Sequence, residues 1–309
     1  MRSDAVLSWL ALGAVAVGGI ACSSSAPPAT TGTESTPPPA FSDTTGEVAN
    51  QPAVYPAGPY GVSVGAVIQN FDFVGYQDPR TNHSSMQLIQ LADFYNPHGK
   101  DPSYTPAAGA EDDRYFPTTT GYENAGKLKP VVLVIQIASV WCGPCNEEAA
   151  TILPAKHALY EPCGGEFLLQ LADSENPGTP ATPKNLLNWT QQYHVNYPAA
   201  IDPSYKLQPL WAADAYPENF IIDTTTMKIV YVLPGEALAL ACNNVEPCNT
   251  DADCQSCSQL VQGDPTTYCG DGTPCNSAAD CTAKTCTIGE FWAKYEPLLD
   301  KTRSGCTVK

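Results

Sequence analysis

The stretch that most constrains the fold is an apolar run that ends in two closely spaced cysteines, VVLVIQIASVWCGPC at residues 131–145. Its first part, a run of about nine residues, is rich in Val and Ile and carries no charge. This composition is typical of a strand buried on both faces of a mostly parallel sheet. The residues that follow, NEEAA at 146–150, favour a helix whose early acids complement the helix dipole. The sequence therefore predicts a strand, a break and a helix, with both cysteines at the break.

Cys142 and Cys145 are the candidate catalytic residues. At a helix N-terminus, unbonded N–H groups and the positive end of the dipole lower a thiol pKa below its free value of about 8.5. We therefore predict that Cys142 is the nucleophile and that Cys145, one turn later, resolves a mixed disulfide. Gly143 lets a substrate backbone approach, and Pro144 suits a first helical turn. A permanent disulfide or half of a zinc site is the alternative for this pair.

Three segments resemble a known superfamily. Residues 141–145, WCGPC, are the active-site pentapeptide of thioredoxins, and residues 215–223, AYPENFIID, resemble the segment that carries the thioredoxin cis-proline. Residues 64–73, VGAVIQNFDF, resemble the opening segment of the membrane-anchored TlpA/ResA-like, AhpC/TSA-related branch of the thioredoxin-like superfamily. The resemblance covers residues 60–236 and the last helix.

This resemblance implies an α/β fold of the thioredoxin-like type, with a central mixed sheet flanked by helices. It implies that the dithiol exchanges with protein disulfides and that Pro217 is the cis residue. The substrate-binding residues that it implies are Trp141, Gly143, Pro144, Tyr216 and Pro217. No metal or organic cofactor is expected, because the redox-active group is the disulfide between Cys142 and Cys145. The four histidines also lack the spacing of metal ligands.

Two positions near the dithiol differ from thioredoxins. Gln136 stands where thioredoxins have a buried Asp that helps to move the proton of the resolving thiol, and an amide there is common in the anchored branch. This position therefore leaves Cys145 without an obvious local acid. Glu148, three residues after Cys145, matches an acid common in the anchored branch, although Ala150 replaces the proline that usually follows.

The N-terminal region predicts export and an anchor. The apolar segment within residues 1–21 is shorter than the roughly twenty residues that cross a bilayer, so we predict a lipoprotein-type signal peptide. Residues 19–22 resemble a lipobox in which Cys22 is lipidated, and an ordinary signal peptide is the alternative. Residues 22–59, rich in Ser, Thr, Pro, Ala and Gly, predict a disordered tether.

The rest of the chain, residues 60–309, predicts one thioredoxin-like domain. Strands, helices and then a hairpin alternate in the thioredoxin order. We expect a strand or hairpin at 62–75, an amphipathic segment at 86–95 and a surface loop at 96–129. After the active-site helix we expect a strand at 167–172, a helix at 183–193, a short strand at 197–201, a helical turn or two at 204–213, a hairpin from 220–222 and 229–233, and a last helix at 291–301.

A cysteine-rich insert at residues 241–287 interrupts this domain and is a tandem repeat. Eight of the 13 cysteines lie in it, spaced by five, five and two residues in the first repeat and by five, five and four in the second. Such a unit has few large apolar residues, so we predict four disulfides, two per repeat. Zinc is the alternative, and calcium at the insert's aspartates is a further one. Cys163 and Cys306 are left to pair with each other.

Together these features predict an exported thiol-disulfide oxidoreductase on the periplasmic or cell-surface side of a bacterial membrane. Its expected partners are disulfide-containing exported proteins, a membrane dithiol donor and the membrane itself through the lipid anchor. The formal net charge of −17 argues against nucleic acid as a partner. Two alternatives stay open, namely a peroxiredoxin-like thiol peroxidase and a non-enzymatic surface protein that binds through the insert.

Overall fold

The computed structural model describes residues 22–23, 55–80, 86–118, 124–210, 215–242, 246–248, 251–258, 267–269, 273–281 and 284–308. The predicted signal peptide and most of the predicted tether lie outside these ranges. Among the described residues, no helix has the length and the apolar character needed to cross a bilayer.

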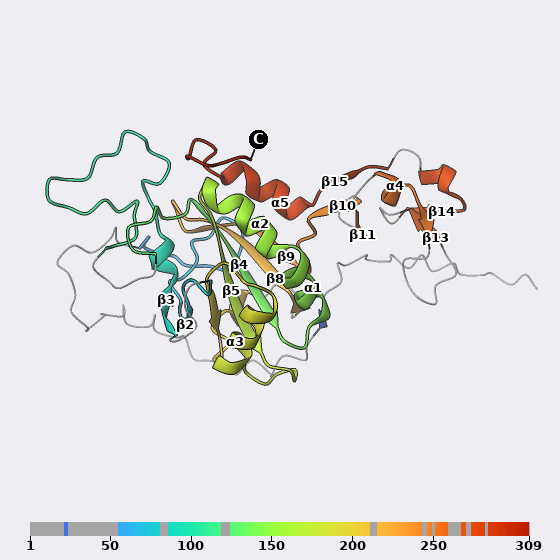
Figure 1. The fold of residues 1–309 in the computed structure, drawn as a ribbon, viewed down its shortest axis with the longest axis horizontal. Helices are drawn as coiled ribbons and strands as arrows, with labels where there is room; N and C mark the ends of the chain where they lie inside the picture. Colours follow the sequence, from blue (N-terminus) through green and yellow to red (C-terminus); the bar gives the residue numbers. More distant parts are fainter. Residues whose placement is uncertain are drawn as a thin grey trace, which may run out of the picture.

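A seven-stranded mixed sheet forms the centre of the molecule, in the order β3-β2-β6-β5-β4-β8-β9 (Figure 1). Its strands are β2 (Asp72–Tyr76), β3 (Gln87–Gln90), β4 (Val132–Ser139), β5 (Gly165–Asp173), β6 (Ala199–Ile201), β8 (Glu218–Asp223) and β9 (Lys228–Pro234). All eight residues of β4 are buried, between β5 on the parallel side and β8 on the antiparallel side. The apolar run therefore forms the central strand that the sequence predicts.

Helices follow the strands in the expected order. They are α1 (Gly143–Thr151), α2 (Leu153–Tyr160), η2 (Glu161–Cys163), α3 (Pro183–Gln192), η3 (Gln208–Leu210), α5 (Glu290–Tyr295) and η5 (Glu296–Leu298). Aromatic rings pack the last helix against α2 and the sheet. The Trp292 ring lies 5.7 Å, centroid to centroid, from Tyr160 of α2 and from Phe167 of β5. The last helix ends before residue 301, because Pro297 cannot continue it.

The region before the central strand differs from the prediction. Regular pairing begins only at β2, and the chain before it makes isolated bridges, including Tyr60 with Val67. The segment 86–95 is strand β3 followed by a 3-10 helix, η1 (Leu91–Phe94). The loop at 96–129 leaves the body as expected, and its ends are closed by bonds from Asn96 Nδ2 and Arg303 Nη2 to the Lys129 carbonyl, at 3.2 and 2.8 Å.

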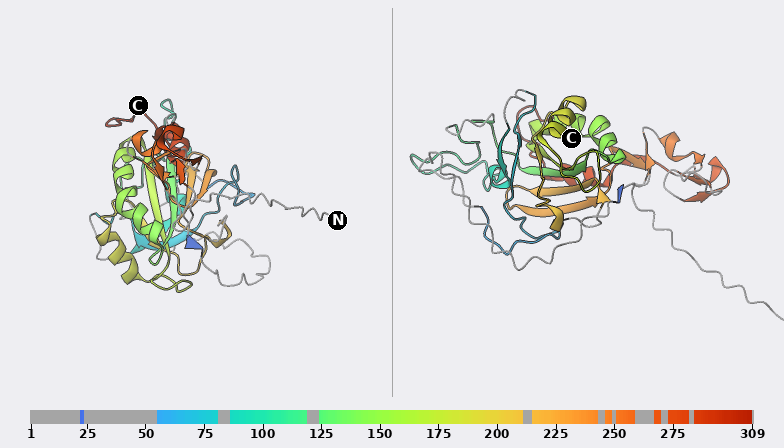
Figure 2. Two further views of the ribbon diagram at one scale, coloured as in Figure 1. Left: turned by 90° about the vertical axis from the view of Figure 1, so that its right-hand side faces the viewer. Right: turned by 90° about the horizontal axis from the view of Figure 1, so that it is seen from below.

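The insert contains two small sheets. The first joins β10 (Leu240–Cys242), β11 (Glu246–Pro247) and β15 (Cys286–Ile288), and the second joins β12 (Cys257–Ser258), β13 (Thr267–Cys269) and β14 (Pro274–Cys275), with α4 (Asp251–Cys254) and η4 (Ala278–Cys281) between strands. Figures 1 and 2 show the insert projecting from one end of the body, opposite the loop at 96–129. It is a separate small unit on a two-strand connection.

Disulfides hold this insert together, as predicted, but one of them joins the two repeats. Cys242 pairs with Cys254 and Cys269 with Cys281, each within its own repeat and each 12 residues apart. Cys248 pairs with Cys286 of the other repeat, so the prediction of two disulfides per repeat is wrong. The reason is spatial, because β10 and β15 lie side by side and bring the two ends of the insert together. Among the described residues, two groups of cysteines lie close enough to hold a metal ion, residues 242, 248 and 254 and residues 269, 275 and 281, and all six are disulfide-bonded.

Two further pairings complete the fold. Cys163 is bonded to Cys306, which confirms the prediction for that pair and fixes the C-terminal segment to the end of η2. Near the N-terminus, the two-residue strand β1 (Cys22–Ser23) pairs antiparallel with β7 (Ala215–Tyr216).

Candidate functional site

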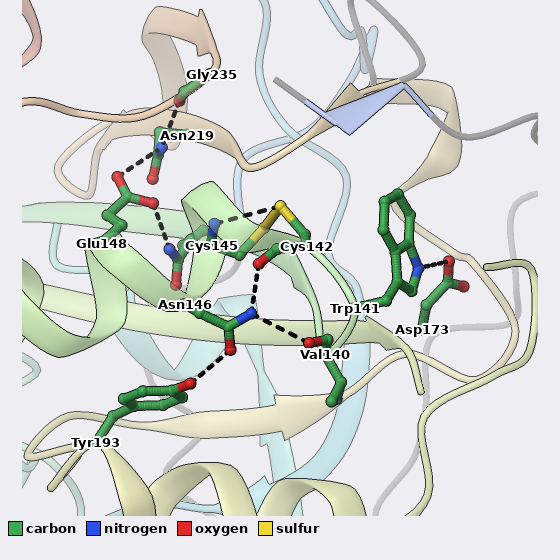
Figure 3. The surroundings of a disulfide bond; sticks show 11 residues. Val140, Trp141, Cys142, Cys145, Asn146, Glu148, Asp173, Tyr193, Asn219 and Gly235 are labelled. Atoms are coloured by element: carbon green, nitrogen blue, oxygen red, sulfur yellow. Dashed lines mark hydrogen bonds between the residues drawn. A yellow bond between two sulfur atoms is a disulfide. The ribbon is translucent and has the colours of Figure 1, made fainter. Parts of the chain in front are cut away.

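Cys142 is the N-cap of α1, where the sequence predicts the nucleophile (Figure 3). Its Sγ forms a disulfide with Cys145 and accepts a hydrogen bond from the Cys145 backbone N–H at 3.2 Å. Both side chains are fully buried, while Gly143 between them is exposed. An N–H donor and the positive end of the helix dipole both stabilise negative charge at Cys142 Sγ once the disulfide is reduced.

Trp141 is held beside this disulfide by a buried carboxylate. Its Nε1 donates to Asp173 Oδ2 at 2.9 Å, and the Tyr205 hydroxyl donates to Oδ1 of the same residue at 2.6 Å. The Trp141 ring meets the ring of Tyr216 edge to face at 5.8 Å. The sequence therefore identified Trp141 and Tyr216 as neighbours of the site but missed Asp173, which lies at the end of β5.

The peptide bond between Tyr216 and Pro217 is cis, as predicted. The Pro217 carbonyl oxygen accepts from the Gly235 backbone N–H at 2.8 Å, which ties this turn to the end of β9. The chain thus has a capping cysteine after the central strand, a cis-proline before an antiparallel hairpin, and a closing helix. The fold is thioredoxin-like.

Comparisons with known proteins add little to this assignment. No protein-family model matches the chain, and no curated protein matches it. Similar solved structures include a secreted thiol-disulfide isomerase from Corynebacterium glutamicum, with 15% identity, 59% of this chain and 87% of that chain covered, and a TM-score of 0.34.

A second is a DsbF homologue from Corynebacterium diphtheriae, with 15% identity and a TM-score of 0.32; the match covers 54% of this chain and 76% of that chain. A third is a thiol:disulfide interchange protein from a Bacteroides species, with 10% identity and a TM-score of 0.34; the match covers 55% of this chain and 81% of that chain. Because these TM-scores are low, we base the fold on the strand order and on the cis-proline.

A buried acid lies behind the dithiol, where the sequence suggested that none was obvious. Glu148 is completely buried in α1, one turn after Cys145. Its Oε1 accepts from Asn219 Nδ2 at 3.0 Å and from the Ala237 backbone N–H at 2.8 Å, and its Oε2 accepts from Gln136 Nε2. Gln136 therefore does not leave the site without an acid, because its amide binds one.

Burial raises the pKa of Glu148 to about 8, and the three hydrogen bonds offset part of that rise. Such a group takes up and releases a proton near neutral pH, which suits a general acid or base. Two signals in the sequence point to this network. Glu148 follows Cys145 at a spacing of three on a helix, and Gln136 is the polar residue inside an apolar strand.

A second acid lies at the rim of the network. Glu236, half-buried, comes directly before Ala237, and burial together with the charge of Glu147 raises its pKa to about 7. Its charge in turn raises the pKa of Glu148. The environment of the dithiol is therefore acidic on the side of the insert.

The turn that carries the dithiol has its own support. Asn146 Nδ2 donates to the carbonyl oxygen of Val140, at 3.2 Å, and to that of Cys142. Its Oδ1 accepts from the hydroxyl of Tyr193, the residue directly after α3 (Figure 3). This bracket fixes the backbone on both sides of Trp141. Asn146 could not be singled out from the sequence, because an asparagine in a first helical turn is common.

The backbone of Cys22 pairs with that of Tyr216, next to this site. The side chain of Cys22 lies outside the described residues, so its lipidation stays a prediction. Among the described histidines, His98 lies 3.8 Å from Asp113 and His157 lies 2.8 Å from Glu166, in different parts of the chain.

Proposed function

We propose that this protein is an extracytoplasmic thiol-disulfide oxidoreductase of the TlpA-like group that reduces disulfides in exported proteins. The observation that carries the proposal is the Cys142–Cys145 disulfide at the N-terminus of α1, with a cis-proline turn on one side and a buried acid behind it. The helix N-terminus favours a thiolate at Cys142, and the buried acid suits proton transfer at Cys145.

The reaction begins from the reduced dithiol. The Cys142 thiolate attacks one sulfur of a substrate disulfide, so that a mixed disulfide forms and the other substrate sulfur leaves as a thiolate. Cys145 then loses its proton to the Glu148 carboxylate and attacks Cys142 Sγ. The Cys142–Cys145 disulfide forms, the second substrate sulfur leaves, and the substrate has gained two electrons.

Trp141, Gly143 and Pro144 would face the substrate in this mechanism, and Tyr216 and Pro217 would align its backbone. The antiparallel pairing of β1 with β7 supports that role, because it shows that this edge accepts an extended strand. The oxidised enzyme must then be reduced again, and a membrane dithiol donor is the natural source of the two electrons. No metal or organic cofactor enters these steps.

The location follows from the insert. Structural disulfides form and persist in oxidising compartments, and the insert and the C-terminal segment contain four such bonds among the described pairs. We place the protein on the periplasmic or cell-surface side, with Cys22 as the lipid anchor. Cys22→Ser removes the predicted lipidation site, and loss of this variant from the membrane fraction would support the anchor.

The thiol peroxidase alternative is less well supported. A peroxidatic cysteine stands alone in a Thr-x-x-Cys setting, whereas residues 138–141, ASVW, precede Cys142. The structure also gives Cys142 a resolving partner in the next helical turn, at a Cα–Cα distance of 5.3 Å. Peroxide consumption faster than that of a free thiol would revive this alternative.

A trapping experiment tests the proposal. In Cys145→Ser, the mixed disulfide at Cys142 cannot be resolved, so the reduced protein should form a covalent complex with a disulfide-containing substrate protein. In Cys142→Ser, with Cys145 intact, no complex should form. A Cys145→Ser protein that forms no complex above the level of Cys142→Ser would contradict the proposed function.

A further inference from the structure

The insert enters and leaves the body at one place. The chain leaves β9 through residues 235–239 and continues as β10, and it returns as β15 and passes through Gly289 into α5 (Figure 1). β10 and β15 are paired from Leu240 with Ile288 onward, and the Gly289 N–H donates to the Ala239 carbonyl at 3.3 Å. We call residues 235–239 and 289–292 the stalk base, because both connections to the insert pass through it.

This stalk base is bonded directly to the acid behind the dithiol. The Ala237 backbone N–H donates to Glu148 Oε1 at 2.8 Å. The Asn219 amide donates both to that same oxygen, at 3.0 Å, and to the Gly235 carbonyl, at 3.1 Å (Figure 3). Two of the three donors to Glu148 thus belong to the stalk base or are held by it.

Trp292 fixes the other side of the same segment. Its indole Nε1 donates to the Ala237 carbonyl at 2.9 Å, and both residues are fully buried. Trp292 is itself immobilised, since its ring packs against Phe291, Tyr160 and Tyr295 at centroid distances of 5.0 to 5.9 Å. Ala237 is therefore held from both sides, by Glu148 at its N–H and by Trp292 at its carbonyl.

We propose that the stalk base is a positioning element of the dithiol site, in which Trp292 holds Ala237 so that its N–H keeps the Glu148 carboxylate in place beside Cys145. The inference rests on the proposed function and deepens it, because it assigns a role in proton transfer to the root of the insert. A partner that displaces the insert then changes how readily Cys145 gives up its proton, and the redox state of the dithiol changes the insert in return.

The hydrogen bond from Ala237 determines the direction in which the pKa of Glu148 should change. A bond from an N–H group stabilises the charged carboxylate, so weakening it raises the pKa of Glu148 further above its ordinary value. Among the described residues, the titratable groups that interact with Glu148 are Tyr197 before β6 and Glu236 on the stalk base, while Cys142 and Cys145 on α1 are disulfide-bonded and do not titrate in the oxidised protein. Burial keeps Tyr197 neutral, so Glu236 is the neighbour whose charge varies in the relevant range.

The experiment compares Trp292→Phe with Tyr295→Phe in the full chain. Trp292→Phe keeps an aromatic ring but removes the donor to Ala237. Tyr295→Phe removes a hydroxyl from the same helix and the same aromatic cluster, but it keeps the ring beside Trp292 and leaves the Trp292 donor to Ala237 in place. Carboxyl NMR on glutamate-labelled, oxidised protein reads the titration of Glu148, whose signal is assigned by its loss in Glu148→Gln, and the pH profile of disulfide exchange is recorded for each variant.

We expect the Glu148 midpoint in Trp292→Phe to rise by about one pH unit, with the exchange profile moving in the same direction. Tyr295→Phe should titrate like the wild type. The inference is overturned if Trp292→Phe titrates like the wild type, or if Tyr295→Phe shifts by the same amount. A wild type that shows no exchange at all contradicts the proposed function instead, while the titration still tests the hydrogen bonds.

A measurement on the unmodified protein covers the case in which Trp292→Phe does not fold. The Ala237 amide proton should shift with pH at the same midpoint as the Glu148 carboxyl carbon, because the two groups share one hydrogen bond. An Ala237 amide signal that does not follow the ionisation of Glu148 would overturn the inference without any substitution.

Discussion

The body and the insert are stabilised in different ways, and their cysteines differ accordingly. In the body, a central strand with eight buried residues packs between two others, and the disulfide of Cys142 and Cys145 is placed at a helix N-terminus beside a buried acid. In the described part of the insert, the buried apolar clusters consist of cysteines alone. A disulfide is therefore a reactive group where the surroundings stabilise a thiolate, and a structural one where it replaces a hydrophobic core.

The largest expected effect separates the two kinds of cysteine. Cys142→Ser removes the nucleophile, so disulfide exchange should fall by at least about 10³-fold. The matched control is the double variant Cys248→Ser with Cys286→Ser, which removes an insert disulfide and should keep most of the exchange rate. Exchange measured with a fluorescent disulfide substrate checks both. A double variant as inactive as Cys142→Ser would erase the distinction between body and insert.

The next effect concerns stability. The Cys163–Cys306 bond closes a chain separation of 143 residues, so replacing both cysteines by Ser should lower the free energy of unfolding of the body by up to about 5 kcal/mol. The Cys248–Cys286 bond, with a separation of 38, should contribute about 4 kcal/mol to the insert alone. Urea unfolding followed by tryptophan fluorescence reports the stability of the body. The free energy of unfolding measured in this way should fall only in the variant without the Cys163–Cys306 bond.

A smaller effect appears as pH dependence. Glu148 must be ionised to accept the proton of Cys145, so the exchange rate should rise with pH up to about 8, the pKa of Glu148. Glu148→Gln should lose this rise and be roughly 10²-fold slower at pH 8. Asp173→Asn, which changes a buried acid on the other side of the dithiol, serves as the control and should keep the same pH dependence.

The same group affects stability with a defined sign. The folded-state pKa of Glu148 lies above its ordinary value of 4.5, so the folded protein keeps a proton that the unfolded chain has lost. Its stabilising contribution is complete below pH 4.5 and is lost as the pH rises toward 8, by up to about 1.4 kcal/mol per pH unit. Unfolding experiments across this range should show the slope in the wild type and a flatter curve in Glu148→Gln.

The smallest effect tests the support of Trp141. Tyr205→Phe removes one hydrogen bond to Asp173 while the bond from Trp141 remains, so stability should fall by about 1 kcal/mol. The exchange rate should stay within about twofold of the wild type. A larger loss of exchange would mean that Asp173 positions Trp141 only with the help of Tyr205.

Much of the fold could be predicted because its signals are local. The central strand and the capping position of Cys142 follow from the chemistry of short segments, and the cis bond at Pro217 follows from the resemblance of residues 215–223 to the thioredoxin cis-proline segment. The late start of β2 and the early end of α5 were missed, because pairing partners and a single proline decide those boundaries.

The rest depends on contacts between distant parts of the chain. The donor at Ala237 lies 89 residues from Glu148, so the sequence could suggest an acid but not the network that binds it. The bond between Cys248 and Cys286 was missed for the same reason, since the repeat pattern favours pairing within each repeat. Spacing identifies which cysteines need partners, and only the fold decides which partners they have.

The most direct test of the distinction between the reactive disulfide and the structural ones is the reduction potential of every disulfide in one sample. The protein is equilibrated in dithiothreitol redox buffers at pH 7, alkylated, and read by mass spectrometry. We predict that Cys142–Cys145 titrates near the roughly −270 mV of thioredoxin, while Cys248–Cys286 and Cys163–Cys306 stay oxidised to below about −300 mV. A Cys142–Cys145 pair that resists reduction as the others do would contradict the account, and a value near −120 mV, typical of a strong oxidant, would contradict its role as a reductant.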